Sequence, residues 1–148
     1  MTDLLVIGIG SEIRGDDIAG RLLAEAVQAL GLPGVDVLAC HQLTPELAER
    51  AAAARCVVFA DACPDVDSAR LVPVESARSP ARIGHAGSPA ETLELARALW
   101  GRAPEAWLLA LPADSFGLGD PPTRRCLAGV EAGVRQILSL AEACPCTR

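Results

Sequence analysis

A chain of 148 residues suits one globular domain, and its 51% hydrophobic and 22% charged residues are typical of folded rather than disordered proteins. The net charge of −6 provides no basic face for the backbone of a nucleic acid, so we expect no nucleic-acid partner. All 13 basic residues are arginines, which excludes Schiff-base lysines and the phosphate-binding lysine of nucleotide loops. We expect a single domain over residues 1–148, with a mobile tail at 142–148.

The N-terminal residues predict neither a targeting peptide nor a membrane anchor. The chain starts with a strand-length apolar run and carries no basic leader. Its longest apolar stretches fall well short of the roughly 18 residues that a membrane-spanning helix needs. The six cysteines do not form two CxxC pairs, so no structural zinc site is expected. These features together predict a cytoplasmic protein with no membrane partner.

The first half of the chain predicts three strands that alternate with two helices. Leu4–Ile9 is a continuous apolar run, the pattern of a strand buried on both faces. Gly31 provides a stop for the first helix, and Thr44 followed by Pro45 is a typical start for the second. The predicted elements are, in order, a strand over Leu4–Ile9, a helix over Asp16–Leu30, a strand over Val35–Ala39, a helix from Thr44-Pro45 through Ala54, and a strand over Cys56–Ala60 that ends at Asp61.

The second half continues the alternation. Pro73 interrupts the next strand, which predicts a position near an edge of the sheet. Ser88 and Glu91 form a capping-box pattern, with Pro89 at the first helical position. The predicted elements are a strand over Leu71–Val74, a helix over Pro89–Trp100, a strand over Trp107–Leu111 and a helix over Arg124–Ala141. Strands alternating with helices predict an α/β fold, with a parallel sheet covered by helices on both faces.

Polar residues follow the predicted strands at the edge where open α/β sheets bind their ligands. The loop after the first strand carries Asp16 and Asp17, the third strand ends at Asp61, and His85 precedes a predicted helix. The loop is not a nucleotide site, because Ile13 replaces a required glycine and Asp16 stands at the lysine position of a phosphate loop. Two carboxylates and an imidazole form an O/O/N ligand set for a borderline divalent ion, with positions left open for a substrate.

Each of these residues also has a competing structural interpretation. Asp16 and Asp17 would serve as partners of a helix dipole in its first turn. Because adjacent helical residues point about 100° apart, we expect at most one of the two to face the crevice. Asp61 would cap the loop that follows it, and His85 would be an ordinary surface residue.

Four segments of the chain resemble the hydrogenase maturation proteases, which process the large subunit of nickel–iron hydrogenases. They are, in the same order as in that family, Gly8-Ile9-Gly10-Ser11 through Asp16-Asp17 to Gly20, His41-Gln42-Leu43-Thr44-Pro45-Glu46-Leu47-Ala48, Phe59-Ala60-Asp61-Ala62, and His85. The resemblance covers nearly the whole chain. It implies a three-layer α/β sandwich, with a five-stranded, mostly parallel, twisted sheet and helices on both faces.

The resemblance also implies a function and a set of site residues. In the family, an endopeptidase removes a short C-terminal extension from the large-subunit precursor after nickel has been inserted. Carried over residue by residue, Asp17, Asp61 and His85 are the metal ligands and catalytic residues, with Asp16 as a candidate assistant. The nickel is presented by the precursor, and no organic cofactor is implied.

Two other functions stay open on the sequence alone. One is a non-catalytic assembly protein that binds nickel or the precursor and leaves the extension intact. The other is a hydrolase that uses Cys40 or Cys63 as its nucleophile. His41 competes with His85 for any role as a metal ligand.

Overall fold

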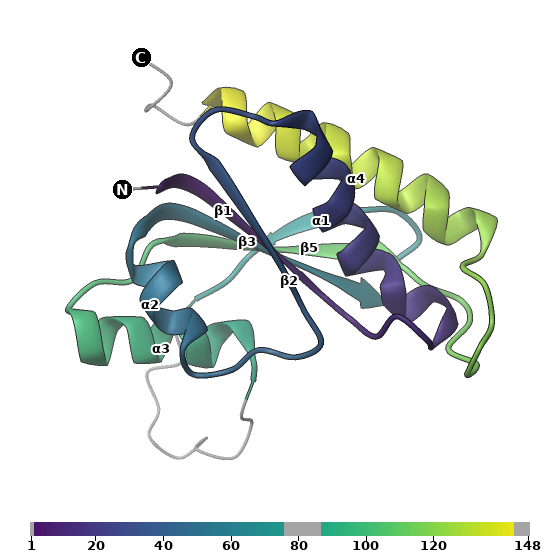
Figure 1. The fold of residues 1–148 in the computed structure, drawn as a ribbon, viewed down its shortest axis with the longest axis horizontal. Coiled ribbons are helices and arrows are strands. Elements are labelled where there is room, and N and C mark those ends of the chain that lie inside the picture. The colour runs from purple at the N-terminus through teal and green to yellow at the C-terminus, as the bar shows by residue number, and fades with distance from the viewer. Residues whose placement is uncertain (1, 76–86, 144–148) are drawn as a thin grey trace.

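A computed structural model describes residues 2–75 and 87–143, and it contains one five-stranded sheet in the order β2-β1-β3-β5-β4 (Figure 1). Three strand pairs are parallel, and only the edge strand β4 runs antiparallel to its neighbour β5. The strands are β1 (Thr2–Ile9), β2 (Val35–Cys40), β3 (Ala54–Cys63), β4 (Arg70–Pro73) and β5 (Glu105–Pro112). The predicted α/β class, with a mostly parallel sheet, is therefore confirmed.

Helices cover both faces of the sheet. Helices α1 and α4 lie side by side on one face, while α2 and α3 lie together on the other (Figure 1). The helices are the short 3-10 helix η1 (Gly15–Ile18), α1 (Ala19–Leu30), α2 (Leu47–Ala52), α3 (Pro89–Trp100) and α4 (Arg124–Ala143). In the parts of the chain that the structure describes, none of them is both long enough and apolar enough to cross a membrane.

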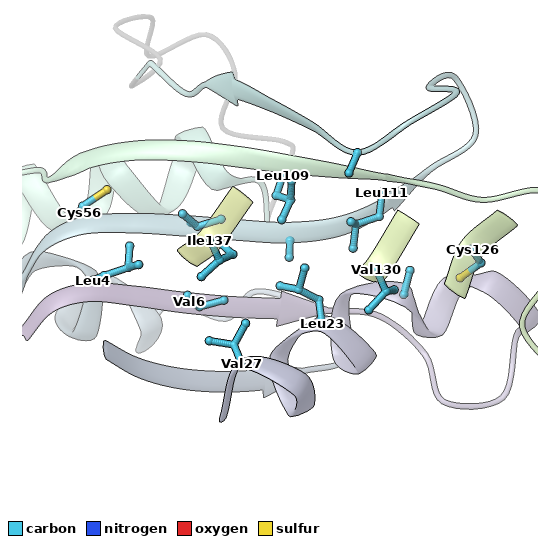
Figure 2. Packing of buried hydrophobic residues seen from close by; sticks show 14 residues of the cluster. Leu4, Val6, Leu23, Val27, Cys56, Leu109, Leu111, Cys126, Val130 and Ile137 are labelled. Carbon is cyan, nitrogen blue, oxygen red and sulfur yellow. The ribbon is translucent and has the colours of Figure 1, made fainter. Parts of the chain in front are cut away.

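The central parts of β1, β3 and β5 are apolar because each face of these strands meets a different helix pair. Leu4 and Val6 of β1 point into the cluster under α1 and α4, where they meet Leu23 of α1 and Ile137 of α4 (Figure 2). Leu5 and the next odd-numbered residues point into the second cluster, on the side of α2 and α3. This two-sided burial explains the continuous apolar run that predicted β1.

Two predicted helix ends are observed with the expected geometry. Gly31 ends α1 in the left-handed conformation, with φ of 57°, which glycine adopts without steric cost. Ser88 caps α3, because its Oγ accepts a hydrogen bond from the N–H of Glu91 at 3.1 Å. The amide of Gly87 donates in turn to Glu91 Oε2 at 3.2 Å, which completes the first turn.

Several element boundaries differ from the sequence prediction, among them those of α2, α1 and β3. The second helix begins at Leu47 and ends at Ala52, because Thr44 and Pro45 form a turn whose carbonyls accept from Leu47 and Ala48. The stretch predicted as one helix from Asp16 starts as η1 and becomes α-helical only at Ala19. Strand β3 continues beyond the predicted end at Asp61 because β5 pairs with it as far as Cys63.

The start of α1 lies directly against the sheet, and glycine makes this contact possible. A Cβ atom at Gly20 would overlap the carbonyl oxygens of Ile9 in β1 and Ala60 in β3. Gly8 has the reciprocal role, because a Cβ there would overlap the carbonyl oxygen of Gly20. The close approach brings the residues that precede α1 next to the carboxyl ends of β1 and β3.

We expect Gly20→Ala to destabilise the fold by about 3 kcal/mol, because backbone atoms of two strands must move to admit the methyl group. The matched control is Gly133→Ala in α4, where the new methyl would meet only the flexible ends of leucine side chains. That variant should stay within about 1 kcal/mol of wild type, since alanine is the better helix former. Urea unfolding measures both, and equal effects would contradict the close-approach argument.

Candidate functional site

The site lies where the connections of the sheet reverse direction. From β1 the chain passes through α1 to β2 on one side, and from β2 it passes through α2 to β3 on the other side of β1. The loops that leave the carboxyl ends of β1 and β3 therefore diverge. Ligands of open α/β sheets bind between loops that diverge in this way. The amide of Gly10 donates to the carbonyl of Cys40 at 3.0 Å, which ties the loop after β1 to the end of β2.

Asp17 comes from the loop after β1, within η1. Its carboxylate is half-buried, and Oδ2 accepts a hydrogen bond from the amide of Ser11 at 3.1 Å. The loop thus folds back so that Asp17 is held against the segment that directly follows β1. This contact leaves the remaining lone pairs of the carboxylate free to accept a further partner.

Asp61 comes from β3, where it pairs in register with Ala110 of β5. Because side chains alternate along a strand, Asp61 lies on the same side of β3 as Val57 and Phe59, toward α2 and α3. The side chain is half-buried, and Oδ1 accepts from the amide of the next residue, Ala62, at 2.8 Å.

The pKa of Asp61 depends on its burial and on the charge of Asp17. Burial, with a smaller contribution from the negative charge of Asp17, raises the pKa of Asp61 to about 6, against a lowering by the Ala62 amide. A cation bound beside Asp61 would favour its ionised form and offset the repulsion from Asp17. Asp17 and Asp61 thus interact electrostatically, whereas their role as a shared ligand set stays a prediction.

Asp16, the immediate neighbour of Asp17, has a different environment. It is fully buried, and its carboxylate accepts hydrogen bonds from the amides of Asp114 (2.8 Å), Ser115 (3.2 Å) and Thr123 (2.6 Å), and from the Thr123 hydroxyl (2.7 Å). Burial alone would raise the pKa of Asp16, but these four hydrogen bonds outweigh it and hold the pKa below the usual value. Of the adjacent aspartates, Asp16 is bonded in the interior, whereas Asp17 is half-buried and bonded to the loop after β1.

His85 lies outside the described residues. The nearest described residue that follows it is Gly87, at which a Cβ atom would lie 3.2 Å from the carbonyl oxygen of Leu43, in the loop after β2. His41, the competing histidine, lies in the same loop and is exposed. Within residues 2–75 and 87–143, no group of three or more His, Cys, Asp and Glu side chains is arranged to hold a metal ion.

Cys40 is a described cysteine whose thiol pKa depends on the charge of Asp61. It is the last residue of β2 and half-buried. Burial raises the pKa of the Cys40 thiol, the charge of Arg21 lowers it, and Asp61 raises it again, so the net shift is upward. A raised pKa keeps the thiol protonated, whereas a cysteine nucleophile needs the thiolate.

Two contributors to the site were not predicted from the sequence. Arg21, in the first turn of α1, follows Asp17 by four residues and pairs with Glu12 at 2.9 Å. This spacing is a signal that the sequence does contain. The loop of residues 113–123, which surrounds Asp16, gives no such signal, because its contacts join residues about a hundred positions apart.

The fold described above is similar to that of solved nickel–iron hydrogenase maturation proteases. No protein-family model and no curated protein matches the sequence. Among solved structures, the maturation protease HycI from Thermococcus kodakarensis shares 24% identity over 95% of this chain and 91% of its own, with a TM-score of 0.70. The maturating endopeptidase HybD from E. coli shares 22% identity over 95% and 93% of the two chains, with a TM-score of 0.73. The resemblance predicted from the sequence is thus confirmed for the fold.

Proposed function

We propose that this protein is an endopeptidase that removes a C-terminal extension from the nickel-loaded large-subunit precursor of a nickel–iron hydrogenase. The observation that carries the proposal is the electrostatic interaction of Asp17 with Asp61, near the carboxyl ends of β1 and β3. That interaction occurs in a fold shared with hydrogenase maturation endopeptidases.

In this proposal the nickel belongs to the substrate, and the protein recognises it. Asp17 and Asp61 supply two oxygen ligands, and His85 supplies a neutral nitrogen ligand as the resemblance implies. Binding the metal positions the peptide bond that follows it in the crevice. Asp61 must be ionised for this role, and since its pKa lies at about 6, it is mostly ionised at pH 7.

The two alternative functions make different demands on the chain. A cysteine-dependent hydrolase requires an ionised thiol, which the raised pKa of Cys40 disfavours. A non-catalytic assembly protein requires only the cation site and would bind the loaded precursor without cutting it. Cleavage itself therefore separates this alternative from the proposal.

The direct test mixes the purified protein with nickel-loaded and nickel-free forms of a large-subunit precursor and follows the extension by mass spectrometry. We expect the loaded form to lose its extension and the nickel-free form to stay intact. Alkylation of the cysteines before mixing should leave cleavage in place. Loss of cleavage after alkylation would favour the cysteine hydrolase, and binding without cleavage would favour the assembly protein.

A further inference from the structure

The most completely bonded polar group of the described chain outside the proposed ligand set is the buried carboxylate of Asp16. Its oxygens accept four hydrogen bonds, all from the loop of residues 113–123, which we call the β5–α4 loop. An ionised carboxylate in the interior is costly unless it is fully bonded in this way. The arrangement holds together two loops that the sequence separates by about a hundred residues.

Backbone contacts strengthen the same connection on both sides of Asp16. The amide of Asp16 donates to the carbonyl of Ser115, and the amide of Gly119 donates to the carbonyl of Ile13, each at 2.7 Å. Gly15 has a φ of 54°, and a Cβ atom there would lie 2.5 Å from the carbonyl oxygen of Ser115. The loop that carries Asp17 is therefore bonded to the β5–α4 loop along most of its length.

The connection extends into α4 through Thr123. The Thr123 hydroxyl donates to Asp16 and accepts from the amide of Cys126, in the first turn of α4. Asp16 is thus fixed by a helix that packs on α1 as well as by a loop. Because Asp17 is the next residue, fixing Asp16 in the interior restricts the directions in which the Asp17 carboxylate can point.

We infer that Asp16 is a positioning residue, which joins the β5–α4 loop to the first loop and thereby orients Asp17 toward the crevice. The inference rests on the proposed function only for its effect on cleavage. It assigns no proton transfer to Asp16, and the carboxylate acts through Asp17 and the backbone of the first loop.

The test compares Asp16→Asn and Thr123→Val with two controls. Thr123→Ser keeps the hydroxyl, and Ile137→Val removes a methylene from the core at a buried position of α4, remote from the loops. We expect Asp16→Asn and Thr123→Val to lower kcat/KM for the loaded precursor at least tenfold, because small displacements of a binding group are expensive. Thr123→Ser and Ile137→Val should remain within about twofold of wild type, although Ile137→Val also lowers the Tm.

A second readout does not depend on cleavage. The amide of Ser11 donates to Asp17, so its hydrogen exchange, measured by NMR, reports whether Asp17 is held in place. Exchange at Ser11 should accelerate in Asp16→Asn and Thr123→Val and stay unchanged in Thr123→Ser. Wild-type exchange in both of the first two variants would overturn the inference, as would an equal loss of kcat/KM in Ile137→Val. If wild-type protein cuts no precursor, the proposed function fails, and the exchange data still decide the role of Asp16.

Discussion

Replacing Asp17 by asparagine should lower cleavage of the nickel-loaded precursor by about 100-fold or more. Asparagine keeps the size of the side chain, and its oxygen can still accept from the Ser11 amide, so the first loop should keep its conformation. What is lost is the negative charge and the basicity that make a carboxylate a metal ligand. Changes that only disturb the partners of a ligand already cost about 10–100-fold, so loss of a ligand should reach the upper end of that range.

The matched control for this variant is Glu12→Gln. It removes one negative charge from the same loop, but Glu12 is exposed and bonded to Arg21 at the surface. Cleavage, followed by mass spectrometry of the extension, should change less than about threefold, because an exposed pair contributes little. Full processing by folded Asp17→Asn protein would exclude Asp17 as a ligand, and an equal loss in both variants would point to the charge of the loop as a whole.

Asp61→Asn should abolish cleavage and, at the same time, make the fold more stable at neutral and alkaline pH. The pKa of Asp61 in the folded protein is about 6 against the ordinary 3.8, so folding favours the protonated carboxyl. The stability that the protonated Asp61 carboxyl contributes to the fold is fully present below pH 3.8, and it is lost as the pH rises through about 6. At pH 8 the wild type therefore holds an unfavourable charge that asparagine does not have.

We expect the free energy of unfolding of Asp61→Asn to exceed that of wild type by about 1–2 kcal/mol at pH 8, after allowance for the partial exposure of the carboxylate to water. The gain should shrink between pH 6 and pH 4 and be close to zero at the lower value. Urea unfolding at pH 8, 6 and 4 measures it, with the exposed Asp65→Asn as a control that should show no such trend. An Asp61→Asn variant less stable than wild type at pH 8 would show that the charge of Asp61 is satisfied in the fold.

The main elements of the sheet could be predicted from the sequence because their signals are local. The apolar run of β1 shows burial on both faces, and the proline in β4 indicates an edge. Ser88 and Gly31 mark helix ends through bonds and conformations that involve only neighbouring residues. The start of α2 was placed too early, since a Thr-Pro pair suits a turn as well as the start of a helix.

The candidate site could be predicted in part. Asp17 follows β1 and Asp61 lies near the end of β3, and the general rule for open α/β sheets places ligand-binding residues at that edge. The sequence cannot show which of two adjacent aspartates faces that edge, because η1 and the partners of Asp16 decide it. The raised pKa of Cys40, which disfavours a cysteine nucleophile, could not be predicted from the sequence either. It comes from burial and from Asp61, a residue of another strand.

By itself, the sequence determined the α/β class, the alternation of strands and helices, and the residue types available for a cation site, because hydrophobic periodicity and capping act over a few residues. Only the tertiary structure decided that the charge of Asp17 raises the pKa of Asp61, and that Asp16 is bonded to a loop about a hundred residues away. The physical reason is that burial and electrostatic coupling depend on distance in space. Strand order, close contact at glycine and long-range hydrogen bonds set that distance once the chain has folded.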